Sequence, residues 1–160
     1  MIDWLLIGIA VAVGGGGSGE STSSAEVPAP TASESFEAED QTPTGKFTTA
    51  AEVKQIVALT KANWVAVREY NGQDWVYATQ LLNWRCGMHQ MRFSINDGPM
   101  EIWEMPRCQL DMSTPNAFPE DDLPYRTYPP GHVQSIEIEV LFDDLDIDSA
   151  RFERAQVLIP

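Results

Sequence analysis

Hydrophobic residues recur at helical spacing soon after the first third of the chain. Val53 and Val57 fall on one face of a 3.6-residue period. Thr49 and Glu52 precede them at the spacing of a capping box, in which a hydroxyl and a carboxylate satisfy free backbone N–H groups at a helix start. The pattern therefore predicts one amphipathic helix over about residues 50–61.

After this helix the pattern changes to that of β-strands. Residues 64–70 and 73–84 are rich in β-branched and aromatic side chains and are joined by Asn71-Gly72. That dipeptide favours a type I′ turn, because both of its positions need positive φ, and so it predicts a hairpin. A second hairpin is predicted from residues 89–95 and 100–105, which flank a turn sequence of Asn, Asp, Gly and Pro.

The next stretch, residues 106–131, holds six prolines. Their missing N–H donors exclude a central strand, so a long irregular connection is predicted. From Val133 to Phe142 apolar and polar residues alternate, as in a half-buried antiparallel strand. Residues 149–159 contain one segment typical of a helix and one typical of a strand, and we favour a strand that closes the sheet.

Together these elements indicate a mainly β (α+β) domain over residues 47–160. One N-terminal helix packs on an antiparallel sheet or on a small β-sandwich of about six strands. Residues 14–46 contain Val27 and Phe36 as their only large apolar side chains and are otherwise rich in Gly, Ser, Pro and acids. Such a stretch cannot bury enough apolar surface to offset the entropy of ordering it, which predicts a disordered linker.

Residues 1–13 form a hydrophobic leader. The apolar run from Leu5 to Val13 is shorter than the roughly 20 residues that cross a bilayer, and its length is typical of the core of a signal peptide. No basic residue precedes this core, where Asp3 is the only charged side chain. We predict a signal peptide or short anchor, with cleavage left open. The protein is then periplasmic or secreted and meets the membrane only through this segment.

Composition narrows the choice of partners. The chain carries 10 Lys and Arg against 24 Asp and Glu, a net charge of −14, and both the linker and the domain have an excess of acids. Binding to nucleic acid needs clustered basic residues that displace counterions from phosphates, and the sequence has no such cluster. The expected partner is a protein of the cell envelope or a glycan, and no cofactor is predicted.

Cys86 and Cys108 are the only cysteines. They flank the second predicted hairpin, whose ends lie close in space, so a disulfide is the favoured interpretation in an oxidising compartment. Two alternatives remain open: a pair of buried thiols, and a metal site that adds His89 and His132 to the cysteines. The spacing of these four residues matches no compact zinc motif.

A second metal hypothesis concerns the acids that follow the alternating strand. Asp144, Asp146 and Asp148 resemble the opening of a calcium-binding loop. Ser149 and Ala155 stand where an EF-hand requires Gly and Glu. The three aspartates are therefore weak metal candidates, and an acidic solvated turn is favoured.

Aromatic residues are the most informative candidates for binding. Large aromatics exposed on a sheet stack on sugar rings or anchor a protein partner, whereas buried ones fill the core. Long ordered loops, such as the proline-rich connection, also carry recognition. The candidate contact residues are Trp75, Trp84, Arg85, Trp103, Tyr125 and Tyr128.

The sequence contains no recognised catalytic signature. No serine lies in a Gly-x-Ser-x-Gly elbow, and His89 and His132 each stand alone. We therefore expect an extracytoplasmic, non-enzymatic domain that binds a protein partner in the cell envelope. A carbohydrate- or small-ligand-binding module that uses exposed aromatics is the alternative, and a hydrolase with an unrecognised site is a third.

Overall fold

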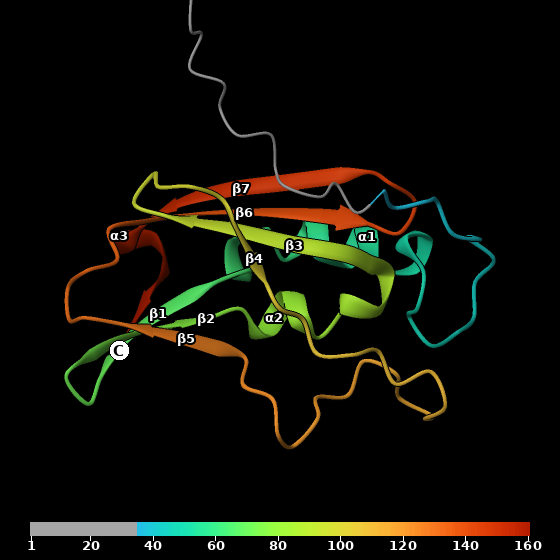
Figure 1. Cartoon of the computed structure of the whole chain (residues 1–160), viewed down its shortest axis with the longest axis horizontal. Helices are drawn as coiled ribbons and strands as arrows, with labels where there is room; N and C mark the ends of the chain where they lie inside the picture. Colours follow the sequence, from blue (N-terminus) through green and yellow to red (C-terminus); the bar gives the residue numbers. More distant parts are fainter. Residues whose placement is uncertain (1–34) are drawn as a thin grey trace, which may run out of the picture. The chain divides into compact units, whose positions relative to one another are not determined.

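The computed structural model describes residues 35–160 (Figure 1). The predicted leader and the first part of the predicted linker lie outside this range. The described part is an α+β domain with one N-terminal helix and two four-stranded sheets, which confirms the predicted fold class. The elements are α1 (Ala50–Leu59), β1 (Ala66–Tyr70), β2 (Gln73–Tyr77), α2 (Thr79–Leu82), β3 (Met88–Ile95), β4 (Glu101–Trp103), β5 (Tyr125–Tyr128), β6 (Ser135–Phe142), β7 (Ile147–Glu153), α3 (Arg154–Val157) and β8 (Leu158–Ile159), with 3₁₀ turns at Lys61–Asn63 and Arg85–Gly87.

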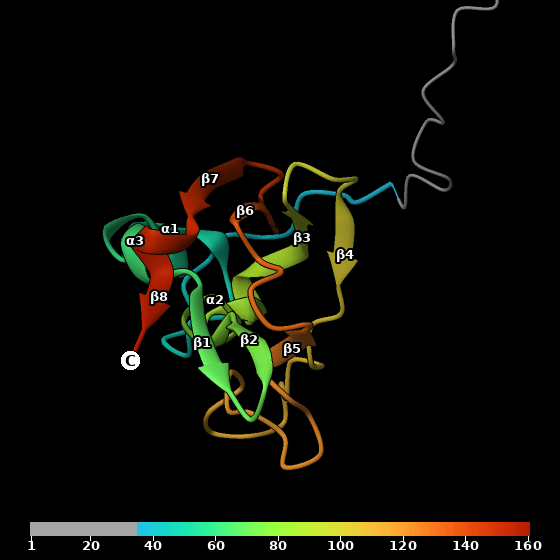
Figure 2. The ribbon, with the colours of Figure 1, turned by 90° about the vertical axis from the view of Figure 1, so that its left-hand side faces the viewer.

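The strands form two sheets, one above the other in both views (Figure 1 and Figure 2). The first sheet has the order β5-β2-β1-β8 and the second has the order β4-β3-β6-β7. All neighbouring strands are antiparallel except β1 and β8, which run parallel. Among the four edge strands β7 is the longest, with 7 residues, whereas β4, β5 and β8 have 3, 4 and 2.

Helix α1 confirms the predicted amphipathic helix, although it ends at Leu59 and a 3₁₀ turn follows. The Thr49 hydroxyl accepts a hydrogen bond from the N–H of Glu52, as in a capping box. The Glu52 carboxylate departs from that motif, because it accepts three backbone N–H groups from the preceding loop 44–47. Desolvation acts to raise the pKa of Glu52, but these hydrogen bonds outweigh it and lower the pKa to about 2.

Both predicted hairpins are confirmed. Asn71 and Gly72 join β1 to β2 with φ values of 51° and 71°, the positive pair that a type I′ turn requires. In the second hairpin β3 pairs with β4, and Asn96 and Asp97 take the positive φ values.

The first hairpin is shorter than predicted. Strand β2 ends at Tyr77, and the predicted continuation to residue 84 contains the helical turn α2, which the 3₁₀ turn at 85–87 follows. Leu81 and Leu82 are both buried, although neighbouring residues on a strand point to opposite faces. The apolar residues Ala78, Leu81, Leu82 and Trp84 do not alternate regularly with polar ones, so the pattern fits a buried helical turn as well as a strand.

The proline-rich stretch contains one strand where none was predicted. Strand β5 lies between Pro124 and Pro129 and pairs with β2 alone, at the edge of its sheet. An edge strand needs N–H donors toward only one neighbour, so prolines can flank it. The rest of residues 106–131 has no regular strand or helix, as expected.

The C-terminal stretch combines both of the structures that its sequence suggested. Strand β7 runs antiparallel to β6, whose alternating residues are buried on one face as predicted. The turn α3 and the two-residue strand β8 follow, and β8 lies beside β1. The favoured single strand over 149–159 is thus interrupted at Arg154–Val157.

The chain enters the domain along residues 35–46. The N–H of Glu39 donates to the backbone carbonyl of Asp143 at 2.8 Å, and the Gln41 amide donates to the Asp143 carboxylate at 2.8 Å. The same carboxylate accepts the N–H of Ala50 at the start of α1, also at 2.8 Å. Residues 39–41 of the predicted linker are therefore hydrogen-bonded to the domain.

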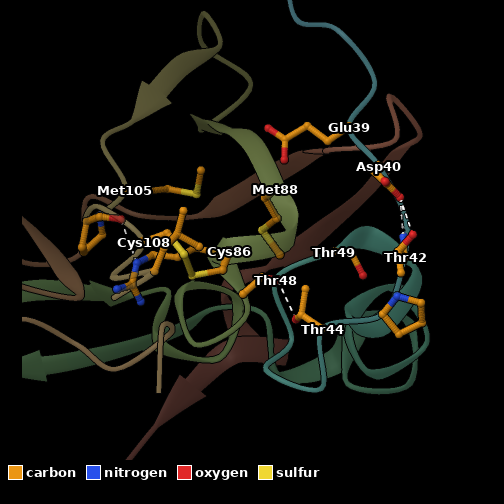
Figure 3. A pocket seen from close by; sticks show the side chains of 14 residues that line it. Glu39, Asp40, Thr42, Thr44, Thr48, Thr49, Cys86, Met88, Met105 and Cys108 are labelled. Carbon is orange, nitrogen blue, oxygen red and sulfur yellow. Dashed lines mark hydrogen bonds between the residues drawn. A yellow bond between two sulfur atoms is a disulfide. The ribbon is translucent and has the colours of Figure 1, made fainter. Parts of the chain in front are cut away.

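A disulfide joins Cys86 to Cys108 with a Cα–Cα distance of 5.3 Å (Figure 3). It closes a loop that contains the β3–β4 hairpin, as the sequence indicated. The thiol and metal alternatives for this pair are therefore wrong in this structure.

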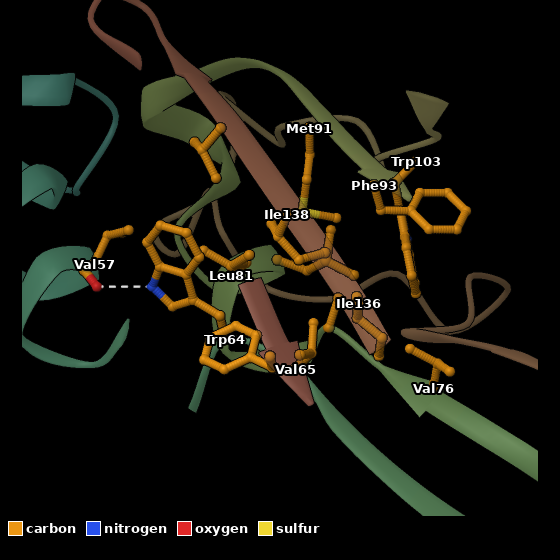
Figure 4. Close-up of a cluster of buried hydrophobic side chains, with 14 of the residues drawn as sticks. Val57, Trp64, Val65, Val76, Leu81, Met91, Phe93, Trp103, Ile136 and Ile138 are labelled. Carbon is orange, nitrogen blue, oxygen red and sulfur yellow. Dashed lines mark hydrogen bonds between the residues drawn. The ribbon is translucent and has the colours of Figure 1, made fainter. Parts of the chain in front are cut away.

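A hydrophobic core fills the domain (Figure 4). Trp64, at the end of the 3₁₀ turn after α1, is fully buried, and its indole Nε1 donates to the carbonyl of Val57 at 2.8 Å. Phe93 and Trp103 meet edge to face with their ring centroids 5.2 Å apart. Helix, first sheet and second sheet thus share one core.

Candidate functional site

One face of the first sheet carries a group of aromatic side chains that is turned away from the core. Residues paired directly across antiparallel strands lie on the same face, and Trp75 pairs with Arg68 while Tyr77 pairs with Tyr125. The alternating neighbours Val67 and Val76 are fully buried on the other side. We call this surface the aromatic face; it comprises Tyr70, Trp75, Tyr77 and Tyr125, with Arg68 beside them.

The four rings of the aromatic face pack against one another. The Trp75 ring centroid is 4.4 Å from that of Tyr125 in a stacked arrangement, and 5.4 Å from that of Tyr70 in an edge-to-face arrangement. Tyr77 completes the group at 6.3 Å from Trp75. Mutual packing fixes the rings in one orientation, so a contact made here costs little side-chain entropy.

Arg68 has no carboxylate partner among residues 35–160. Its guanidinium carbon lies 4.8 Å from the centroid of the Tyr70 ring, within the range of a cation–π contact. Stacking of this kind orients a guanidinium while its N–H donors remain available at the rim.

Two of the six predicted contact residues, Trp75 and Tyr125, belong to the aromatic face. The sequence reasoning did not single out Arg68 or Tyr70. The Asn-Gly turn fixes the β1–β2 register and puts both residues on the Trp75 side, so alternation across the hairpin would have identified them.

Two other predicted contact residues are buried. Trp103 is 3% exposed and fills the core beside Phe93. Arg85 is 2% exposed and donates to five backbone carbonyls, four of which belong to the proline-rich connection, at Pro106, Arg107, Asn116 and Ala117. Arg85 therefore holds that connection in place and is not available to a partner.

The remaining two predicted contact residues are half-buried and lie apart from the aromatic face. Tyr128 stacks on His132 at 5.7 Å between ring centroids and packs against the core. Trp84 meets Phe47 edge-on at 5.3 Å beside a hollow of about 500 Å³. Phe47 has a φ of 58°, a left-handed conformation that is uncommon for an aromatic residue.

A cleft of about 620 Å³ lies over the disulfide (Figure 3). Residues 39–49 form one wall, Met105 and Leu110 lie on the other, and the bridge between Cys86 and Cys108 forms part of the lining. Both cysteines are partly exposed.

The acidic turn faces two lysines of the N-terminal helical region. Lys54 contacts the carboxylates of Asp144 and Asp146, and Lys61 contacts that of Asp148 at 2.5 Å. Lys61 also donates to the backbone carbonyl of Ser149 in β7 at 3.3 Å, while the Ser149 N–H donates to the Asp148 side chain at 2.8 Å. Within residues 35–160 no cluster of three metal-ligating residues occurs, and these carboxylates serve as partners of the lysines.

The two histidines lie in different environments. His89 stacks on Phe36 at 4.9 Å between ring centroids, and its Nε2 lies 2.8 Å from the carbonyl oxygen of Glu37. His132 is exposed beside Tyr128. The segment before α1 therefore covers His89, and within residues 35–160 no ring contact or hydrogen bond joins the two histidines.

An ion pair between Asp74 and Arg154 holds β2, the strand that carries Trp75, in place. Asp74 is fully buried on the core side of β2, where its carboxylate accepts N–H groups from Gly131 at 3.1 Å and Val133 at 3.0 Å. Arg154 donates to it at 2.6 Å and reaches Glu69 as well. The hydrogen bond from Arg154 lowers the pKa of Asp74 to about 2, against the desolvation that acts to raise it. The sequence reasoning missed this pair, because its members are far apart along the chain.

Comparisons with protein-family models, with curated proteins and with solved structures found no match to the chain. Among residues 35–160, no helix has both the length and the apolar character that crossing a bilayer demands.

Proposed function

We propose that this protein is an extracytoplasmic, non-enzymatic domain that binds a protein partner through the aromatic face. The observation that carries the proposal is the packed group of Tyr70, Trp75, Tyr77 and Tyr125 on a solvent-facing sheet surface. Tyr and Trp are enriched where protein interfaces concentrate their binding free energy, because they bury large areas at little entropic cost.

The ring geometry favours a protein partner over a glycan. A sugar ring binds to an open aromatic plane, whereas the Trp75 ring is engaged by Tyr125 and Tyr70. What the face offers instead is a set of ring rims, with Tyr70 half-exposed at its end. Rims of this kind suit the irregular apolar surface of another protein.

The disulfide supports the extracytoplasmic part of the proposal. Cytosolic thiols are kept reduced, so a structural bridge is typical of the periplasm or of secreted proteins. Thiol labelling of the unreduced, natively localised protein should leave Cys86 and Cys108 unmodified. Labelling of both sulfurs would contradict the location.

Site-specific photo-crosslinking tests the binding proposal. A photoreactive phenylalanine analogue replaces Tyr70 on the aromatic face or, as the matched control, Ile102 on the second sheet; both side chains are 51% exposed. In full-length protein in its own cells, position 70 should give a discrete crosslinked protein that position 102 does not give. Trp75→Ala and Tyr125→Ser should each reduce the yield.

Two outcomes would overturn the proposal. One is equal crosslinking from both positions, and the other is the absence of any product from position 70. Circular dichroism of each variant verifies that the fold is retained, and Tyr125→Ser, on an edge strand, disturbs it less than Trp75→Ala.

A second candidate function, small-ligand or glycan binding, is favoured by the hollow beside Trp84. Lys46, Phe47 and Trp84 line this space, and the left-handed backbone of Phe47 is a form of strain that clusters at functional sites. Titration with a panel of soluble glycans should then change the tryptophan fluorescence of the wild-type chain but not of Trp84→Phe. An unchanged spectrum with every glycan would exclude this function.

A further inference from the structure

We propose that the partner segment presents a single carboxylate next to an apolar side chain, and that both bind in a hollow formed by Arg68, Ala66, Tyr77 and Ile159. This inference rests on the proposed function and specifies the chemistry of its partner. The occupant is a segment of a protein in which one Asp or Glu is flanked by apolar residues.

The hollow lies on the aromatic face and has a volume of about 460 Å³. Ala66 pairs directly with Tyr77 across the β1–β2 hairpin, and Arg68 pairs with Ile159 across the parallel β1–β8 contact. The small Ala66 side chain among these larger neighbours leaves a space on the surface. Tyr77 belongs both to this hollow and to the packed rings, so one partner segment can contact both.

The apolar part of the proposed ligand fits the lining of the hollow. Ile159 and Tyr77 supply apolar surface, and Ile159 is 42% exposed. Asn63, Thr79 and Gln80 add polar side chains at the same space. Side chains of these types can satisfy the backbone groups of an inserted peptide segment.

The charge of the hollow argues for a carboxylate. Arg68 is the basic residue of this lining, and no acidic residue belongs to it. The nearest acid in sequence, Glu69, points to the other side of the strand and is bonded to Arg154. An arginine oriented on a ring and without a carboxylate partner among residues 35–160 matches the bidentate geometry of a carboxylate.

The overall charge sets a limit on the ligand. At −14 the chain repels anions, although at physiological ionic strength this repulsion is screened beyond about 8 Å. For a single carboxylate, the attraction to Arg68 therefore outweighs the repulsion from the rest of the chain. For a strongly acidic segment the repulsion outweighs the attraction. The same net charge opposes a second copy of this chain as the occupant.

Peptide selection tests the inference. The probe is a library of random short peptides displayed on phage and selected on the immobilised full-length chain. Wild-type protein should enrich peptides with one Asp or Glu beside Leu, Ile or Phe. Arg68→Gln should weaken binding of a synthesised peptide from that set by about tenfold, the loss expected for a charge-assisted hydrogen bond. Arg68→Glu should shift the selected peptides to Lys or Arg at the same place.

Further variants separate this inference from the proposed function. Ala66→Leu fills the hollow and should reduce the recovery of the selected peptides. Arg68 is exposed, so its variants should retain the fold. Selected peptides that lack the acid but depend on Tyr125 would overturn the carboxylate inference and leave the aromatic face as a binding surface. Enrichment of no peptide, or the same peptides with wild type and Arg68→Glu, would also overturn it. A failure of the crosslinking at position 70 counts against the proposed function itself.

Discussion

At the scale of single residues, Asp74 connects parts of the domain that are distant in sequence. Its carboxylate ties β2 to the loop before β6 and, through Arg154, to α3. A fully buried carboxylate is stabilised only while such partners surround it. The outer face of the same strand carries Trp75, so the ion pair also fixes the position of the aromatic face.

Asp74→Asn should lower the free energy of unfolding by about 3 kcal/mol at pH 7, because it leaves the buried end of Arg154 without its charged partner. Since the folded-state pKa of Asp74, about 2, is below the ordinary value of 3.8, its contribution is complete above pH 4 and is lost as the pH falls toward 2. Urea unfolding at pH 5 and pH 2.5 measures this. Wild type should lose about 2 kcal/mol more between these pH values than Asp74→Asn. An equal loss of unfolding free energy in wild type and Asp74→Asn would show that Asp74 is not the source of the pH dependence.

Gly87 marks a close approach between the 3₁₀ turn at 85–87 and α1. A Cβ atom there would lie 2.4 Å from the Val53 Cγ2 and 2.9 Å from the carbonyl oxygen of Thr49. Gly87→Ala should therefore cost about 1–3 kcal/mol of unfolding free energy in chemical denaturation. With Val53→Ala in the same chain the cost should be smaller than the sum of the two single changes. Strict additivity would show that the contact with Val53 is not the cause.

At the scale of elements, the disulfide and Arg85 act on the same connection. The bridge joins the 3₁₀ turn before β3 to the chain after β4, and Arg85, adjacent to Cys86, binds the carbonyls of the proline-rich stretch. That stretch has few backbone hydrogen bonds of its own and is held from outside. The bridge, Arg85 and the pairing of β5 with β2 therefore hold this stretch in place.

The double variant Cys86→Ser/Cys108→Ser should lower the free energy of unfolding by about 3 kcal/mol. This is the contribution expected from the loop-closure entropy of a bridge with a sequence separation of 22. Denaturant unfolding with and without a reducing agent provides the measurement. Reductant should destabilise wild type by a similar amount and leave the double variant unchanged. A wild-type protein indifferent to reductant would rule out a stabilising role for the bridge.

Local signals predicted most of the elements, and long-range contacts decided those that were missed. The hairpins, α1 and β6 each follow from periodicity and turn residues within one segment. Strand β5 forms because β2 has a free edge with which it can pair. Residues 79–82 form the helical turn α2 because Leu81 and Leu82 can then both reach the core. Neither cause can be read from the segment itself.

At the scale of the whole molecule, the candidate binding surface depends on tertiary pairing. Trp75 and Tyr125 were identified as aromatics with a potential role, but only the pairing of β2 with β5 brings them together. Burial removed Trp103 and Arg85 from the candidates, since a sequence pattern cannot distinguish a core aromatic from an exposed one. The part of the face on the β1–β2 hairpin was therefore predictable, and the addition of Tyr125 from β5 was not.

The edges of the two sheets bear on how copies of this protein behave at high concentration. An open strand edge is a template on which other chains can add and grow into fibres. Here β8 and β4 are too short to guide such growth, prolines close both ends of β5, and on β7 the backbone of Ser149 is already occupied by Lys61 and Asp148. Three of the four edges thus give a colliding copy little strand to extend, and on the fourth, β7, the backbone of Ser149 is already bonded.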